Sequence, residues 1–228
     1  SDALIEDNSI YIGNDPSSST DGAERNIALG KEALESITTG DNNTAVGHDA
    51  LKTNTTGSYN TAVGWRSLKS NISGTSNTAV GIESMINNTT GQSNTGFGVQ
   101  ALVHNITGDN NTTVGYFSGK TITTGSNNVI MGYQANPSSA SASNQIVIGK
   151  GATGHGDNIA VIGNGSATAI HPHDDNEVDL GSSTYEYKDI YIDGTAYLDA
   201  VGFGTVTMTL PTADGSANQV LKTDGSGT

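Results

Sequence analysis

Residues 60–76 read NTAVGWRSLKSNISGTS, and the same 17-residue pattern recurs through most of the chain. Its first glycine, Gly64, belongs to a column that advances in 17-residue steps from Gly13 to Gly149 and then by 14 residues to Gly163. A fixed period of this length is typical of stacked repeats, in which each unit buries its apolar face only against its neighbours. The sequence therefore predicts a solenoid rather than a compact globule.

The composition suits thin stacked strands and excludes several other classes of protein. Of the 228 residues, 33% are hydrophobic, 5% are aromatic and 30 are glycine, which is a poor composition for a large compact core. The formal net charge of −14, with only nine Lys and Arg residues, argues against a nucleic-acid partner. The absence of cysteine excludes disulfides and thiolate metal sites. No apolar run approaches the roughly 18 residues that span a bilayer, so no membrane insertion is expected. The chain opens at Ser1 without an initiating Met, which suggests a processed or excised fragment.

Two further columns follow the 17-residue period. The first is a second set of glycines: Gly40, Gly57, Gly74, Gly91, Gly108 and Gly125. Two glycine positions in each repeat predict two tight turns, because glycine reaches positive φ and lets neighbouring backbones approach. The other column is amide-bearing: Asn26, Asn43, Asn60, Asn77, Asn94, Asn111, Asn128 and Gln145. Identical amides on adjacent strands are expected to form a hydrogen-bonded ladder.

The tripeptide Asn-x-Thr/Ser occurs at four positions that share one place in the repeat: Asn54, Asn71, Asn88 and Asn105. These tripeptides formally match glycosylation acceptors. Their recurrence at a turn favours a structural role in turn chemistry instead.

The residues just before each glycine of the first column show a period of two, in which alternate residues share one side of the chain. This pattern predicts one short strand per repeat. Ile27 and Leu29 share one side of their strand, which we assign to the coil interior, and Ala28 points to the outer face. By the same parity, we expect the repeated threonines to be buried, which argues against ice binding; they are Thr44, Thr61, Thr78, Thr95 and Thr112. The Ala-Leu segments, such as Ala33-Leu34, are expected to form a second, less regular strand, with Leu or Met closing the core.

Strands that are apolar on both faces are normally covered on both faces. We therefore expect the outer face to pack against other copies of the chain, and threefold closure about the long axis is the simplest symmetric solution. The predicted fold is an all-β, trimeric parallel β-roll with 17-residue rungs.

The segment Asn158-Ile159-Ala160-Val161-Ile162-Gly163 resembles a repeat of trimeric autotransporter adhesin heads, which form parallel β-rolls. The 17-residue repeat with Thr-Ala-Val-Gly is similar to repeats of bacteriophage tail fibres, and these resemblances cover about residues 8–163. Residues 175–191 also resemble a tail-fibre segment that often precedes a self-cleaving chaperone. The resemblance implies a virion protein that forms a homotrimer with other tail-fibre or virion proteins as neighbours.

The period ends near residue 170, and this change divides the chain into three parts. Residues 1–7 are a lead-in, residues 8–169 form the roll, and residues 170–228 form a β-rich connector with a flexible tail. Asp193-Gly194 separates two apolar runs and predicts a hairpin over residues 190–198. Another strand is expected over residues 205–210, where apolar residues alternate with Thr.

Few residues suggest chemistry. His171 and His173 are candidate ligands of an axial metal, although an exposed loop is the simpler interpretation. The residue after each first-column glycine varies most and is expected at an exposed turn. There, Trp65-Arg66 and Tyr116-Phe117 are candidate contacts to sugar rings or a surface protein. The alternative interpretation is that they are exposed turn residues that bind no partner. No nucleophile with a base and an orienting group is visible, so no enzyme activity and no cofactor are expected.

The functional hypothesis is a structural and adhesive tail-fibre segment that takes part in attachment to a bacterial surface receptor or glycan. The alternative is a bacterial surface adhesin head, which would place the chain at the cell surface. A polysaccharide depolymerase and an ice-binding solenoid are weaker hypotheses.

Overall fold

The computed structural model describes residues 3–6, 8–13, 22–167, 200–203 and 206–209. The chain divides into two compact units, Ser1–Ile170 and His171–Thr228, which are considered separately.

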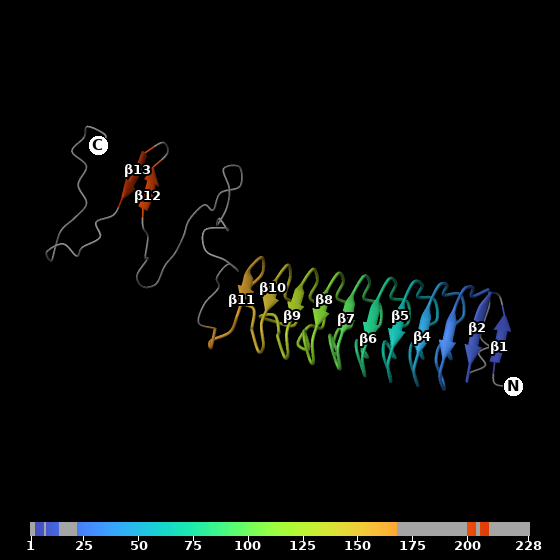
Figure 1. Ribbon diagram of the computed structural model, residues 1–228. Helices are drawn as coiled ribbons and strands as arrows, with labels where there is room; N and C mark the ends of the chain where they lie inside the picture. Colours follow the sequence, from blue (N-terminus) through green and yellow to red (C-terminus); the bar gives the residue numbers. More distant parts are fainter. Residues whose placement is uncertain (1–2, 7, 14–21, 168–199, 204–205, 210–228) are drawn as a thin grey trace. The chain divides into compact units, whose positions relative to one another are not determined.

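The first unit is a coil whose strands form one 11-stranded sheet in sequence order (Figure 1). β1 (Ala3–Glu6) pairs antiparallel with β2, and every later pair is parallel. The strands that follow are β2 (Ser9–Ile12), β3 (Ile27–Leu29), β4 (Thr44–Val46), β5 (Thr61–Val63), β6 (Thr78–Val80), β7 (Thr95–Phe97), β8 (Thr112–Val114), β9 (Val129–Met131), β10 (Ile146–Ile148) and β11 (Ala160–Ile162).

The pairing register follows the glycine period. Thr61 lies opposite Thr78, one 17-residue rung later, whereas Ile146 lies opposite Ala160 across the final 14-residue step. The chain is therefore an all-β parallel solenoid of about nine turns, as the repeat predicted.

The assignment of strand faces made from sequence is wrong. The residues that point into the coil are the central ones of each strand: Tyr11, Ala28, Ala45, Ala62, Ala79, Gly96, Thr113, Ile130 and Val147. Ile27 and Leu29 flank buried Ala28 and are 47% and 46% exposed. The repeated threonines point outward as well, so the expectation that they are buried is also wrong.

The width of the coil interior explains this orientation. Across from the strand, each of five early rungs places one large buried side chain: Leu34, Leu51, Leu68, Met85 and Leu102. These side chains leave room for Ala or Gly on the strand but not for a branched residue. In a later rung, Gly119 occupies the position of these large side chains, and the larger residue Thr113 occupies the strand position. An added Cβ on Gly119 would lie 2.6 Å from Thr113 Cγ2.

The Ala-Leu segments close the core as expected, but they are turns rather than second strands. Leu34, Leu51 and Leu68 have φ of 52°, 50° and 49°, so their backbone is in the left-handed conformation. The backbone still bonds from rung to rung, since Leu51 N–H donates to the Ser67 carbonyl at 3.0 Å. Successive turns stack without forming a second sheet.

Both glycine columns have steric reasons. Gly64 has φ of +134°, and a Cβ placed there would lie 2.5 Å from the carbonyl oxygen of Gly81. In the second column, a Cβ on Gly57 would lie 2.4 Å from the Gly74 carbonyl oxygen. The rungs approach too closely at both turns for any side chain.

The predicted amide ladder is confirmed. Asn60 donates its backbone N–H and Nδ2 to Asn43 Oδ1 at 3.0 and 3.1 Å, and Nδ2 also donates to the Gly74 carbonyl at 2.9 Å. Asn54, Asn71, Asn88 and Asn105, the asparagines that share one place in the repeat, form a second ladder, in which Asn71 Nδ2 donates to Asn54 Oδ1 at 2.7 Å. All four are fully buried, so in the folded coil they are inaccessible to glycosylation.

In the second unit, β12 (Ala200–Phe203) pairs antiparallel with β13 (Val206–Thr209). The strand predicted over residues 205–210 is thus present as β13, whereas its partner was not predicted. The hairpin predicted over residues 190–198 lies outside the described residues.

Candidate functional site

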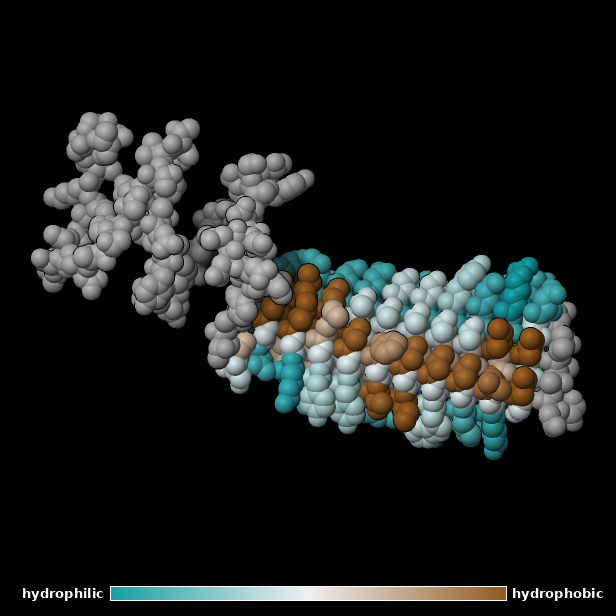
Figure 2. Space-filling view, viewed as in Figure 1, coloured by the Kyte–Doolittle hydropathy of each residue, from teal (hydrophilic) through white to brown (hydrophobic). Residues whose placement is uncertain are grey.

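The outer face of the sheet carries an uncharged and largely apolar surface, called here the strand stripe. It consists of the outward residues of β2–β11 in two columns: Ile10, Ile27, Thr44, Thr61, Thr78, Thr95, Thr112, Val129, Ile146 and Ala160, and Ile12, Leu29, Val46, Val63, Val80, Phe97, Val114, Met131, Ile148 and Ile162. Figure 2 shows it as a brown and pale band along the coil. Its large exposed hydrophobic residues are 37–56% accessible. No charged side chain interrupts the strand stripe, although the chain as a whole carries a net charge of −14.

A second exposed column, called here the turn ladder, lies just after the first-column glycines. It consists of Trp65, Ile82, Val99, Tyr116 and Tyr133, one on each of five successive rungs, and these side chains are 37–49% exposed. The position is an exposed turn, as the sequence variability predicted. Tyr116 and Tyr133 stack with ring centroids 5.2 Å apart and planes inclined by 13°.

The candidate contact residues named from sequence all lie at this turn. Arg66 covers one face of Trp65, with its guanidinium carbon 4.3 Å from the ring centroid. Tyr116 and Phe117 meet edge to face, with centroids 4.5 Å apart. The structure also brings Tyr133 onto Tyr116, a neighbour that the dipeptide pattern missed and that the 17-residue spacing alone would have found.

Beside the turn ladder, the next residue of each rung is usually polar. This row, the polar ladder, consists of Arg66, Glu83, Gln100 and Gln134, with Phe117 interrupting it. Arg66 Nη1 lies 3.5 Å from Glu83 Oε1, and Gln100 Nε2 donates to Glu83 Oε2 at 2.5 Å. All four side chains are half-buried, and Arg66, Glu83 and Gln100 are joined by bonds that run along the coil.

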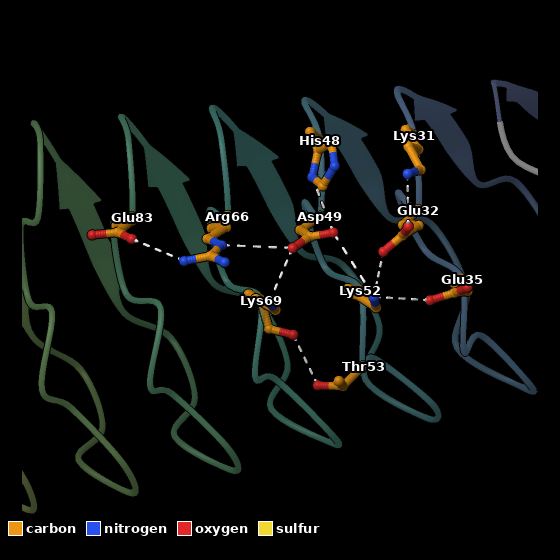
Figure 3. Close-up of polar contacts among 10 residues, drawn as sticks. All are labelled: Lys31, Glu32, Glu35, His48, Asp49, Lys52, Thr53, Arg66, Lys69 and Glu83. Carbon is orange, nitrogen blue, oxygen red and sulfur yellow. Dashed lines mark hydrogen bonds and ion pairs between the residues drawn. The ribbon is translucent and has the colours of Figure 1, made fainter.

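Toward the N-terminal rungs, the same turn holds a network of charges (Figure 3). Its centre is Asp49, whose side chain is only 5% exposed and accepts from Lys69 Nζ at 2.9 Å. Burial would raise the pKa of Asp49, but the hydrogen bond and charge of Lys69, with the charges of His48 and Lys52, outweigh it and lower the pKa. The Asp49 carboxyl is therefore ionised at neutral pH and is paired with Lys69.

The only described group with metal-ligand spacing is in this network: Glu32, His48 and Asp49, whose ligand atoms lie within 4.8 Å of one another. Lys52 already hydrogen-bonds Glu32 and thereby lowers the pKa of that carboxyl, and Lys69 bonds Asp49. Because ammonium groups already occupy the cation positions, we assign no metal to the group. The earlier metal candidates, His171 and His173, lie outside the described residues.

The fold defines the class of protein: a parallel β-solenoid with 17-residue rungs. Comparisons with family models, with curated proteins and with solved structures give no match. No helix among the described residues is long and apolar enough to cross a membrane.

Proposed function

We propose that this chain is a segment of a homotrimeric phage tail fibre that takes part in attachment to the host surface. The observation that carries the proposal is the strand stripe, an uncharged and largely apolar surface that extends over all of β2–β11, with threonine in one of its two columns on β4–β8. Monomeric proteins rarely expose a contiguous apolar patch larger than about 300–600 Å². A stripe ten strands long favours a partner that covers it.

The length and regularity of the strand stripe favour another copy of the chain as that partner. Only a partner with matching rungs meets the same outward row at every step, and symmetric association supplies such a partner. The acidic groups in Figure 3 lie off the stripe, at the turn, so copies that meet through the stripe keep their charges apart. The resemblance to tail-fibre and adhesin repeats favours three copies.

The attachment role rests on that resemblance and on the extended shape of a solenoid, which offers long lateral surfaces. A bacterial cell-surface receptor or glycan and other virion proteins are the proposed partners, and the virion is the proposed location. A bacterial surface adhesin head built on the same coil is the alternative. We propose no enzyme activity, which incubation with host polysaccharide tests: released oligosaccharide would support a depolymerase.

The assembly is tested by measuring the mass of the purified chain in solution. We expect three times the 23.3 kDa of one chain. Ile27→Lys places a charge in the strand stripe and should lower the mass to that of one chain, with an unchanged circular dichroism spectrum. Tyr59→Lys is the matched control, because Tyr59 is 65% exposed outside the stripe and this variant should stay trimeric. A monomeric parent chain would contradict the proposal.

A second candidate function, ice binding, gains support from the corrected orientation of the threonines. Thr44, Thr61, Thr78, Thr95 and Thr112 form a straight outward column, in direct register across β4–β8. Regularly spaced hydroxyl and methyl groups on a rigid face suit ordered water. This function requires an uncovered stripe, so thermal hysteresis from a monomeric chain would favour it over the fibre, and a trimer without hysteresis would exclude it.

A further inference from the structure

The turn ladder is separate from the strand stripe and differs from it in chemistry. A column of glycines without side chains, among them Gly64, Gly81 and Gly98, lies between the two surfaces. Unlike the stripe, the turn ladder has the polar ladder along its other side. It also contains most of the exposed aromatic rings among the described residues: Trp65, Tyr116 and Tyr133.

We propose that the turn ladder and the polar ladder together bind a linear, uncharged glycan that runs along the coil. This inference rests on the proposed attachment role and assigns it a surface and a ligand class. Aromatic and aliphatic side chains supply apolar contact to the C–H faces of sugar rings. Carboxylate, amide and guanidinium groups, here Glu83, Gln100 and Arg66, bind pairs of hydroxyls.

The spacing of the turn ladder suits a polymer. Rungs lie about 4.8 Å apart, so the five positions extend over roughly 19 Å. The observed Tyr116–Tyr133 centroid distance of 5.2 Å is close to that rung spacing. One rung is comparable in length to one pyranose unit, so a linear glycan presents a similar ring edge or face at each successive position.

Charge selects an uncharged glycan over an anionic one. Within the two ladders, Arg66 is paired with Glu83, and the chain has an excess of 14 negative charges. Anionic sugars and nucleic acids would meet this field without a free basic cluster at the site. At its two ends the turn column continues with His48 and Lys150, where the apolar row stops.

The site contains its own reporter, because Trp65 is the only tryptophan of the 228 residues. The probes are linear oligosaccharides of glucose, galactose, mannose and N-acetylglucosamine, titrated to millimolar concentration while Trp65 fluorescence is recorded. We expect a saturable change with at least one of these neutral probes. Tyr116→Ala should weaken binding by at least about tenfold, whereas Tyr116→Phe, which keeps the ring, should lose less.

The matched control is Tyr59→Ala, which removes a more exposed ring, 65% against 42% for Tyr116, on another column and should bind as the parent does. The proposal is overturned if no neutral probe changes the fluorescence, if only anionic oligosaccharides do, or if Tyr59→Ala and Tyr116→Ala weaken binding equally. Solution mass is measured on the same samples. If the protein is a trimer but binds none of the sugars, the glycan site is contradicted and the fibre proposal is not. If the protein is a monomer, the fibre proposal is contradicted.

Discussion

At the scale of single residues, facing positions of the core vary in compensating ways. Ala28 lies in the rung of Leu34, where Ile37 completes the interior. In a later rung, Thr113 takes the strand position, Gly119 takes the leucine position, and Ile122 again completes the interior. The volume lost at one position is recovered at the other, as the close packing of protein interiors requires.

This compensation predicts a coupled pair of substitutions. Gly119→Leu alone should destabilise the coil by about 1–3 kcal/mol, because the new side chain meets Thr113 Cγ2. Thr113→Ala should leave a cavity. The double variant rebuilds the Ala-Leu-Ile combination of the earlier rung, and Gly119 already has the required φ of +64°. Denaturant unfolding of all four proteins should reveal a favourable coupling of about 1 kcal/mol or more; simple additivity would contradict it.

At the scale of the element, the asparagine ladder holds adjacent rungs together. Asn77 Nδ2 donates to the Gly91 carbonyl at 2.8 Å, and its Oδ1 accepts from the Asn94 backbone N–H at 2.9 Å. Asn77→Ala leaves the buried Asn94 N–H without its acceptor and removes one of the two amide donors to the Gly91 carbonyl, which keeps Asn88 Nδ2 at 3.0 Å. We therefore expect a loss of about 1–3 kcal/mol in unfolding free energy. Exposed Asn87→Ala, which removes one surface bond to Val103, should cost less than about 1 kcal/mol. Equal losses from the two substitutions would argue against the ladder as the stabilising element.

The charge network predicts a pH dependence of stability. The pKa of Asp49 is lowered in the folded coil, so its contribution is present above the unfolded value near 3.8 and is lost as pH falls through the lower folded value. Asp49→Asn should therefore lower the melting temperature at neutral pH, and the difference from the parent should shrink below pH 3.8. A difference that stays constant across this acid range would contradict the assignment.

At the scale of the whole solenoid, each rung contacts only its neighbours, so one rung should be removable. Deleting residues 60–76 places Asn77 after Tyr59 and lets Asn77 bond Asn43 in place of Asn60. We expect a folded protein with the same spectrum and a small loss of stability, because the remaining interfaces repeat. Deleting residues 60–67 alone removes part of a rung and should disrupt folding, since it breaks the register of both ladders. Circular dichroism and resistance to proteolysis measure whether each deletion variant is folded.

The repeat period by itself determined the solenoid, the two turns, the asparagine ladder and the exposed position of Trp65, Tyr116 and Tyr133. These follow because stacking brings residues 17 apart into contact, whatever the cross-section of the coil. Only the tertiary structure decided which strand face is inside. Because both faces of each strand are apolar, the sequence pattern identifies the two faces but does not show which of them is buried. That choice depends on the space that Leu68 leaves across the coil from Ala62. That space admits a methyl group, so the branched side chains lie outside and form the strand stripe.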